Sequence, residues 1–161
     1  MDVFVLRHAI AEDAGAGQAD SERRLTDLGR ERLRLVVQKA MRAGMAPAVV
    51  LTSPYVRAHQ TAEILLEELD HPCELVTTSN LTPYAAVADL WQELREYSRL
   101  SPLIVVGHNP QLSELVSVLI GSPRYAVEIK KAAIAYVQDA GNGPRPTGRL
   151  VWMLTAKLAE A

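Results

Sequence analysis

Apolar residues along the chain fall into two alternating patterns, short continuous runs and longer stretches with a helical period. Six short runs rich in Val, Ile and Leu predict β-strands at residues 3–6, 49–52, 74–77, 103–106, 134–138 and 150–154. Between them, four stretches repeat apolar residues at positions i, i+3, i+4 and i+7, as one face of an α-helix does. These stretches predict helices around residues 33–41, 58–69, 87–97 and 112–120.

Capping residues mark the ends of several of these helices. Thr26 is a candidate N-cap for the first helix, and Gly44 is a candidate for its end. The pairs Ser53-Pro54 and Asn109-Pro110 each place a capping side chain before a proline, which is typical of a helix start. We therefore expect the second and fourth helices to begin at these pairs, with their N-termini close to the preceding strands.

The alternation of strands and helices predicts an α/β fold, a three-layer sandwich with a mainly parallel central sheet flanked by helices. The last two strands are joined by the Gly- and Pro-rich segment 139–148, which favours an antiparallel hairpin at one edge of the sheet. The length of 161 residues fits a single domain spanning residues 1–161. The Ala- and Gly-rich segment 12–19 is expected to be a mobile loop.

Composition narrows the classes of function. The formal net charge of −2 gives no indication of a nucleic-acid partner or of an anionic membrane. The single cysteine, Cys73, leaves no internal disulfide and suits a reducing compartment. The sequence has no signal-peptide pattern and no apolar run that could span a membrane. We therefore expect a cytoplasmic protein with no membrane partner.

Basic and imidazole side chains follow three of the predicted strands. Arg7 and His8 follow the first strand, Arg57 comes shortly after the second, and His108 and Asn109 follow the fourth. Because the carboxyl ends of parallel strands meet at one edge of a sheet, we expect these side chains to converge where α/β proteins bind ligands. No carboxylate stands close to these strand ends in the sequence.

This set of side chains favours a phosphoryl group as the ligand. Arginine forks match phosphate oxygens, and the N-termini of the following helices add partial positive charge. A neutral imidazole is in addition a nucleophile at physiological pH. His8 is therefore the candidate to attack phosphorus while Arg7 and Arg57 neutralise the oxygens, so that the phosphoryl group moves in two steps.

Other basic residues have simpler interpretations. Two histidines, three arginines of the first helix and a lysine pair that could alternatively border the phosphate site are expected at the solvated surface: His59, His71, Arg30, Arg32, Arg34, Lys130 and Lys131. His8 and His108 could instead bind a metal ion, but no third Asp, Glu or Cys ligand stands at the strand ends. The neighbouring arginines would also repel a cation, so we expect no metal and no cofactor.

At these residues the sequence resembles the histidine phosphatase superfamily, the fold of cofactor-dependent phosphoglycerate mutases and acid phosphatases. The matching motifs are "LRHA" (6–9), "SPYVRAHQT" (53–61) and "VGHN" (106–109), in the family's order and spacing. Two further stretches, "RRLTDLGRERL" (23–33) and "EIKKAAIAYV" (128–137), are similar to the short SixA-type phosphohistidine phosphatase branch. The likeness extends across the chain and implies a phosphoglycerate mutase-like fold.

The resemblance also implies roles for individual residues. The catalytic set holds or attacks the phosphoryl group and consists of the nucleophile His8 with Arg7, Arg57 and His108. Arg23 matches a position whose arginine approaches the phosphate, and Asn109, beside His108, is a further candidate for substrate binding. Ala9 departs from the family's usual glycine, so the turn after His8 is not settled by the resemblance.

The proton donor of the larger family members has no counterpart here. In those proteins an acidic residue after the third strand protonates the leaving group, and a helical insertion covers the site. In this chain no acid stands beside Leu81-Thr82-Pro83, and the length leaves no room for a lid, so the site should be shallow and open. These features favour a metal-independent phosphatase that acts on phosphohistidine of a protein partner, such as a histidine phosphotransfer domain.

Two alternatives stay open at this point. A small-molecule phosphomonoester phosphatase of the same fold needs a proton donor, which only Glu12 or Asp13 could supply. The second alternative is a module that binds phosphate or a phosphoprotein without turnover. The presence of a nucleophile, His8, beside the binding residues speaks against a pure binding module.

Overall fold

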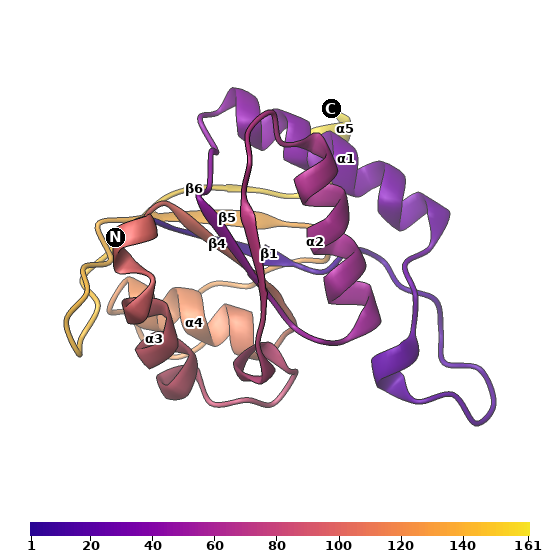
Figure 1. Ribbon diagram of the computed structural model, residues 1–161, viewed down its shortest axis with the longest axis horizontal. Helices are drawn as coiled ribbons and strands as arrows, with labels where there is room; N and C mark the ends of the chain where they lie inside the picture. Colours follow the sequence, from indigo (N-terminus) through magenta and orange to yellow (C-terminus); the bar gives the residue numbers. More distant parts are fainter.

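A computed structural model describes residues 1–161 and places a six-stranded sheet at the centre of the molecule (Figure 1). The strands are β1 (Val3–Arg7), β2 (Val49–Thr52), β3 (Glu74–Thr77), β4 (Leu103–Gly107), β5 (Ile134–Gln138) and β6 (Arg149–Leu154). The helices are α1 (Asp27–Arg42), α2 (Val56–Glu68), α3 (Val87–Glu96), α4 (Gln111–Leu119) and α5 (Ala156–Glu160). Short 3-10 helices span Asp20–Glu22 (η1), Ser79–Leu81 (η2) and Ser98–Leu100 (η3).

The sheet has the strand order β3-β2-β4-β1-β5-β6. Strands β1, β2, β3 and β4 pair in parallel, whereas β5 pairs antiparallel with both β1 and β6. The predicted mainly parallel sheet and the edge hairpin of β5 and β6 are therefore confirmed. The six predicted strands appear within one residue of their expected bounds.

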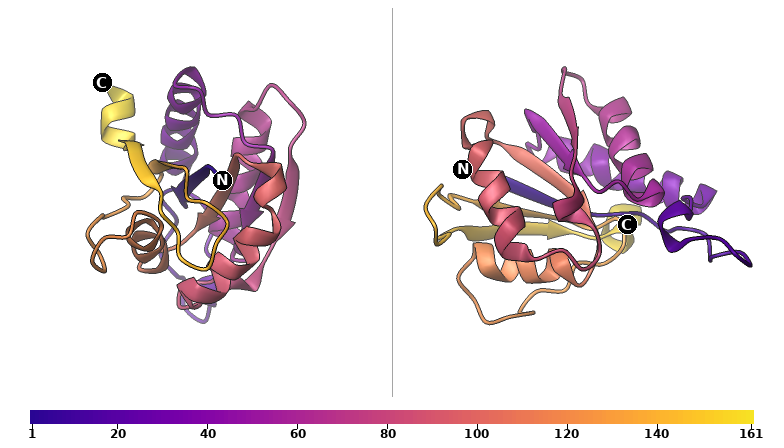
Figure 2. Two further views of the ribbon diagram at one scale, coloured as in Figure 1. Left: turned by 90° about the vertical axis from the view of Figure 1, so that its left-hand side faces the viewer. Right: turned by 60° about the horizontal axis from the view of Figure 1, so that its bottom comes forward.

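The helices cover both faces of the sheet, which gives the three layers (Figures 1 and 2). Side chains of successive strand residues point to opposite faces, so Val3 and Val5 pack in one core with α3 and α4. Phe4 and Leu6 pack in the other core, beneath α1, α2 and α5. The central strands are buried on both faces, as the continuous apolar runs of the sequence require.

The ends of the first helix agree with the sequence, but the starts of two others do not. Thr26 caps α1 through its side chain, which accepts a hydrogen bond from the backbone N–H of Gly29, and Gly44 lies just beyond the helix at φ +92°. The expected start of α2 at Ser53-Pro54 is wrong, because α2 begins only at Val56. Helix α4 begins at Gln111, one residue after the expected Pro110, but Asn109 does not cap it, because no side chain does. Ser53 is not an N-cap of α2, because its hydroxyl contacts His108 and accepts from the backbone N–H of Tyr55.

The segment between β1 and α1 extends outward from the body of the molecule (Figure 1). Its base is closed by a single bridge between Ala11 and Leu25, and residues 12–20 between them are exposed. The helix η1 within this segment contacts α2, so the segment reaches back toward the carboxyl edge of the sheet. No helix of the structure is both long and apolar enough to cross a membrane.

Candidate active site

The parallel register brings the three polar strand ends together. Arg7 lies opposite Gly107 in the pairing of β1 with β4, and Thr52 lies opposite Val106 in the pairing of β2 with β4. The backbone continues these ladders, since the N–H of His8 donates to the carbonyl of Gly107 at 3.0 Å. The expected convergence of the first, second and fourth strand ends is therefore observed.

His8 lies at the centre of this convergence and is only 5% exposed. Its Nδ1 is 2.8 Å from the carbonyl oxygen of Ala9, and a carbonyl can only accept, so Nδ1 carries the proton. Nε2 then has a free lone pair, toward which the Nε–H of Arg57 points at 3.3 Å. This tautomer leaves Nε2 as the nitrogen able to attack.

Ala9 fits the turn after His8 without a glycine. It is fully buried, and its φ is not among the positive values in the chain. Its backbone N–H donates to the hydroxyl of Thr61 in α2 at 3.1 Å, which fixes the turn from the side. The departure from the family's usual residue therefore does not distort the backbone beside the nucleophile.

His108 faces His8, with the two ring centroids 5.0 Å apart. Its Nε2 lies 2.9 Å from the hydroxyl of Ser53, and the edge of the Tyr55 ring packs against it. Its Nδ1 is buried without a partner, and so is the Nε of Arg7. Buried polar atoms of native proteins normally have a partner, so these two nitrogens indicate a polar ligand at this place.

Each of the two arginines of the site is fixed by hydrogen bonds from its guanidinium group to other residues of the protein. Arg57 is 4% exposed, and Arg7 donates from Nη1 to the backbone carbonyl of Ile129 at 3.0 Å. Burial lowers the pKa of both guanidinium groups, in part opposed by Glu128 for Arg7 and by Asp20 for Arg57. A guanidinium group is not deprotonated in proteins, so both arginines supply positive charge to the site.

The electrostatics of the site keep both imidazoles neutral. Burial is the main cause that lowers the pKa of His8 to about 3, and Arg57, Arg7 and Lys131 add to it. Burial likewise lowers the pKa of His108 to about 2, with smaller contributions from His8 and Arg57. The site therefore combines neutral imidazoles with cationic guanidinium groups, which suits an anion that a neutral nitrogen can attack.

Arg23 and Asn109 contact other parts of the protein. Arg23 donates from Nε to Asp20 and from Nη1 to the carbonyl of Glu12, so both bonds stay within the β1–α1 segment. Asn109 donates to the carbonyl of Ile129, the same oxygen that Arg7 binds, and accepts from Ser113. Asn109 thus supports the loop that holds Arg7, and a direct contact of either residue with substrate stays a prediction.

The acidic residue missed by the sequence interpretation is Asp20 in η1. Its carboxylate lies 3.0 Å from Nη2 of Arg57, and its backbone carbonyl accepts from Nη1 at 2.7 Å. Burial opposes its ionisation, yet the hydrogen bonds from Arg23 and Arg57 hold the pKa of this carboxyl below its usual range. No feature of a strand end points to Asp20, because eleven residues separate it from His8; the only sequence signal is its spacing of three from Arg23.

The site is deeper than the sequence suggested. The chain has no helical insertion over the site, but His8, Arg57 and His108 are all buried, and Asp20 lies on the outer end of Arg57. Glu12 and Asp13 are exposed. The histidines expected at the surface are partly exposed, and each lies beside a carboxylate, His59 beside Glu63 and His71 beside Asp70.

The surface basic residues separate into two groups. Two of the α1 arginines form ion pairs away from the site, Arg34 with α2 and Arg32 with Glu160 of α5. Lys130 pairs with Glu128. Lys131 is exposed, and the backbone N–H of the next residue, Ala132, donates to the carbonyls of Arg7 and His8, so Lys131 borders the site, which is the alternative interpretation.

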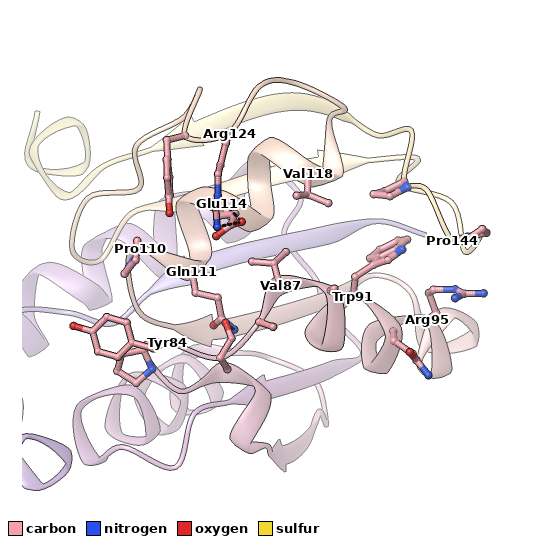
Figure 3. A pocket seen from close by; sticks show the side chains of 17 residues that line it. Tyr84, Val87, Trp91, Arg95, Pro110, Gln111, Glu114, Val118, Arg124 and Pro144 are labelled. Atoms are coloured by element: carbon pink, nitrogen blue, oxygen red, sulfur yellow. Dashed lines mark hydrogen bonds and ion pairs between the residues drawn. The ribbon is translucent and has the colours of Figure 1, made fainter.

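A hollow of the surface lies elsewhere, between α3, α4 and the loops around residues 124 and 144 (Figure 3). It measures about 740 Å³ and includes Tyr84, Trp91 and Pro110 in its lining. None of the side chains that converge on His8 contributes to it. We therefore identify the candidate site by its buried polar groups, and not by its volume.

Comparisons with known proteins identify the family of the chain. The sequence profile of the histidine phosphatase superfamily (branch 1) matches residues 3–86. An uncharacterised protein of Picosynechococcus sp. is 34% identical over 139 residues, covering 83% of this chain and 82% of that protein. The phosphohistidine phosphatase SixA of Escherichia coli is 29% identical over 146 residues, 89% of each protein. The structure of the protein histidine phosphatase SixA complexed with tungstate has a TM-score of 0.86 at 28% identity, over 98% of both chains. The chain belongs to the histidine phosphatase superfamily and is of the SixA type.

Proposed function

We propose that the protein is a metal-independent phosphatase that forms a phosphohistidine intermediate on His8 and acts on phosphohistidine of a protein partner. The observation that carries the proposal is the state of His8, whose Nδ1 donates to Ala9 and whose Nε2 lone pair is directed into a cationic, buried site. A module that only binds phosphate needs the arginines but has no use for a nucleophile held in this tautomer.

The reaction takes two steps. The lone pair of His8 Nε2 forms a bond to phosphorus while the bond from phosphorus to the leaving nitrogen breaks. In the second step the oxygen of a water bonds to phosphorus while the bond from phosphorus to Nε2 breaks, so the electron pair returns to His8 and the hydrogens of the water leave on the inorganic phosphate and on bulk solvent. Arg7 and Arg57 neutralise the oxygens that carry charge in both steps. His108 supplies its unpartnered Nδ1 as a donor in the tautomer protonated there, with its Nε2 accepting from the hydroxyl of Ser53.

The leaving group decides the substrate class. An alkoxide is a poor leaving group, so ester cleavage benefits from a general acid. Asp20 is poorly suited to that role, because Arg23 and Arg57 hold the pKa of its carboxyl low. A phosphorylated imidazole whose distal nitrogen is protonated leaves as a neutral ring, with a conjugate acid of pKa about 6.5, and needs no such donor.

The partner has to present its phosphohistidine as a projecting side chain, because His8 is almost buried. A histidine on the surface of a helical phosphotransfer domain meets this requirement. The name of the Escherichia coli relative, a phosphohistidine phosphatase, supports the same substrate class. A role in signal transduction in the cytoplasm follows from such a partner and is part of the proposal.

A comparison of substrates tests the proposal. We expect kcat/KM to be highest for a phosphohistidine protein, lower for an aryl phosphate and near zero for an alkyl phosphate, because the need for a general acid rises in that order. If the alkyl ester matches the phosphoprotein, the enzyme is a small-molecule phosphomonoester phosphatase, and Glu12 and Asp13 are the first residues to replace. If no phosphorylated compound turns over while phosphate still binds, the protein is a binding module.

Activity should survive removal of metal ions. No three His, Cys, Asp or Glu side chains are grouped so that they could hold a metal ion, and the site carries its own positive charge. We expect unchanged turnover after exhaustive chelation, and inhibition by vanadate, which resembles the transferring phosphoryl group. Loss of activity with EDTA that an added divalent ion restores would contradict this mechanism.

A further inference from the structure

Asp20 joins the two arginines on the outer side of the site. One carboxylate oxygen, Oδ1, accepts from Nε of Arg23 at 2.8 Å, and the other, Oδ2, accepts from Nη2 of Arg57 at 3.0 Å. The backbone carbonyl of the same residue accepts from Nη1 of Arg57 at 2.7 Å. A single residue of η1 therefore binds both terminal nitrogens of Arg57 and is itself held by Arg23.

These contacts define which side of the Arg57 guanidinium faces the nucleophile. A guanidinium group is planar and carries five N–H groups in fixed directions, so fixing its terminal nitrogens also fixes the direction of Nε–H. In Arg57 that Nε–H points at Nε2 of His8. Asp20 accepts the hydrogen bonds that the structure gives to the two terminal nitrogens of Arg57. Without Asp20 the Tyr55 ring, whose centroid lies 5.1 Å from Cζ, would still contact the guanidinium, but no hydrogen bond would fix the directions of its terminal N–H groups.

We propose that Asp20 is a positioning residue, which holds the planar fork of Arg57 with its inner edge toward His8 so that the fork meets the phosphoryl oxygens. This inference rests on the proposed function for its catalytic consequence. Its consequence for oxyanion binding does not depend on turnover. Asp20 does not touch the reacting atoms in this assignment, because it acts through Arg57.

Two other roles for Asp20 predict different behaviour. If the carboxylate competed with the substrate for Arg57, its removal would strengthen the binding of an oxyanion. If it only held the β1–α1 segment in place, its removal would weaken binding whatever residue stood at position 57. The positioning role requires that removal of Asp20 weakens oxyanion binding only when residue 57 is an arginine.

The experiment measures tungstate binding by calorimetry, and kcat and KM with a phosphohistidine protein, for Asp20→Ala and Asp20→Asn. We expect Asp20→Ala to weaken tungstate binding about tenfold and to lower kcat by a similar factor, because small displacements of a binding group are costly. Asp20→Asn keeps an oxygen acceptor for Nη2 and should recover most of the loss. Glu22→Ala is the matched control, because Glu22 is an exposed acid of the same 3-10 helix with no ion pair.

The same measurement in the Arg57→Lys protein separates a positioning role of Asp20 from a structural role. In Arg57→Lys there is no planar fork to orient, so adding Asp20→Ala should change tungstate binding less than about twofold. An equal loss in both backgrounds would overturn the proposal, and so would tighter tungstate binding by Asp20→Ala than by Glu22→Ala. Failure of the wild-type protein to turn over any phosphohistidine protein would refute the proposed function and leave the tungstate result to decide on Asp20.

Discussion

His8→Ala is expected to abolish turnover, with a loss of at least about 10⁴-fold in kcat, while the protein still folds. The proposed reaction passes through a bond between Nε2 of His8 and phosphorus, and no other side chain of the site offers an equivalent lone pair. His108 is the only other imidazole nearby; its Nε2 accepts from the hydroxyl of Ser53, and its Nδ1 carries the proton in the proposed mechanism. Removal of His8 therefore removes the route itself.

The intermediate provides the direct measurement. Rapid quenching of wild-type protein with a labelled phosphoryl donor should trap an adduct that is labile in acid and stable in base, as phosphorylated histidine is. The His8→Ala protein should give no such adduct and should keep the circular dichroism spectrum and a melting temperature close to those of the wild type. His59→Ala is the control, because His59 is partly exposed on α2 and pairs with Glu63. An adduct of unchanged amount on His8→Ala would rule out the assignment.

The strand ends could be predicted from the sequence because two local patterns determine them. Continuous apolar runs identify the parallel strands, and the polar residue that ends each run must emerge at the carboxyl edge. Arg7, His8 and His108 follow this rule directly. Arg57 comes five residues after the second strand, in the first turn of the next helix, so the same rule places it at this edge only through the start of that helix.

Asp20 and Ser53 could not be predicted in the same way, because their partners are distant in the sequence. Ser53 has the residue type and the following proline of a helix N-cap, but the structure uses its hydroxyl for His108, 55 residues away, and the helix starts later. Asp20 lies in an exposed, Gly-containing segment whose path is set by the bridge at its base and by Arg57. A local sequence pattern can suggest a helix cap or a loop, but it cannot show that the same side chain instead contacts a residue far away in the sequence.

Arg57→Lys should lower kcat/KM on the order of a hundredfold, about 2.7 kcal/mol of transition-state stabilisation, although the charge is kept. Arg57 has at least two tasks at once, since its terminal nitrogens bind Asp20 while Nε faces His8. A lysine ammonium is a single point of charge and cannot reach the anchoring carboxylate and the phosphoryl oxygens in the same fixed geometry.

The comparison that isolates the fork uses a second arginine of the same protein. Arg34→Lys makes the same chemical change in an exposed ion pair with Glu67 and Glu68, far from any reacting atom, and should leave kcat/KM within about twofold of the wild type. Arg57→Lys should in addition lose affinity for vanadate in proportion to its loss of kcat/KM, since a group that acts in the transition state also binds its analogue. A loss of only a few-fold in Arg57→Lys would place Arg57 outside the reacting centre. A large loss of kcat/KM with unchanged vanadate affinity would mean that Arg57 binds the substrate protein without contacting the phosphoryl group in transit.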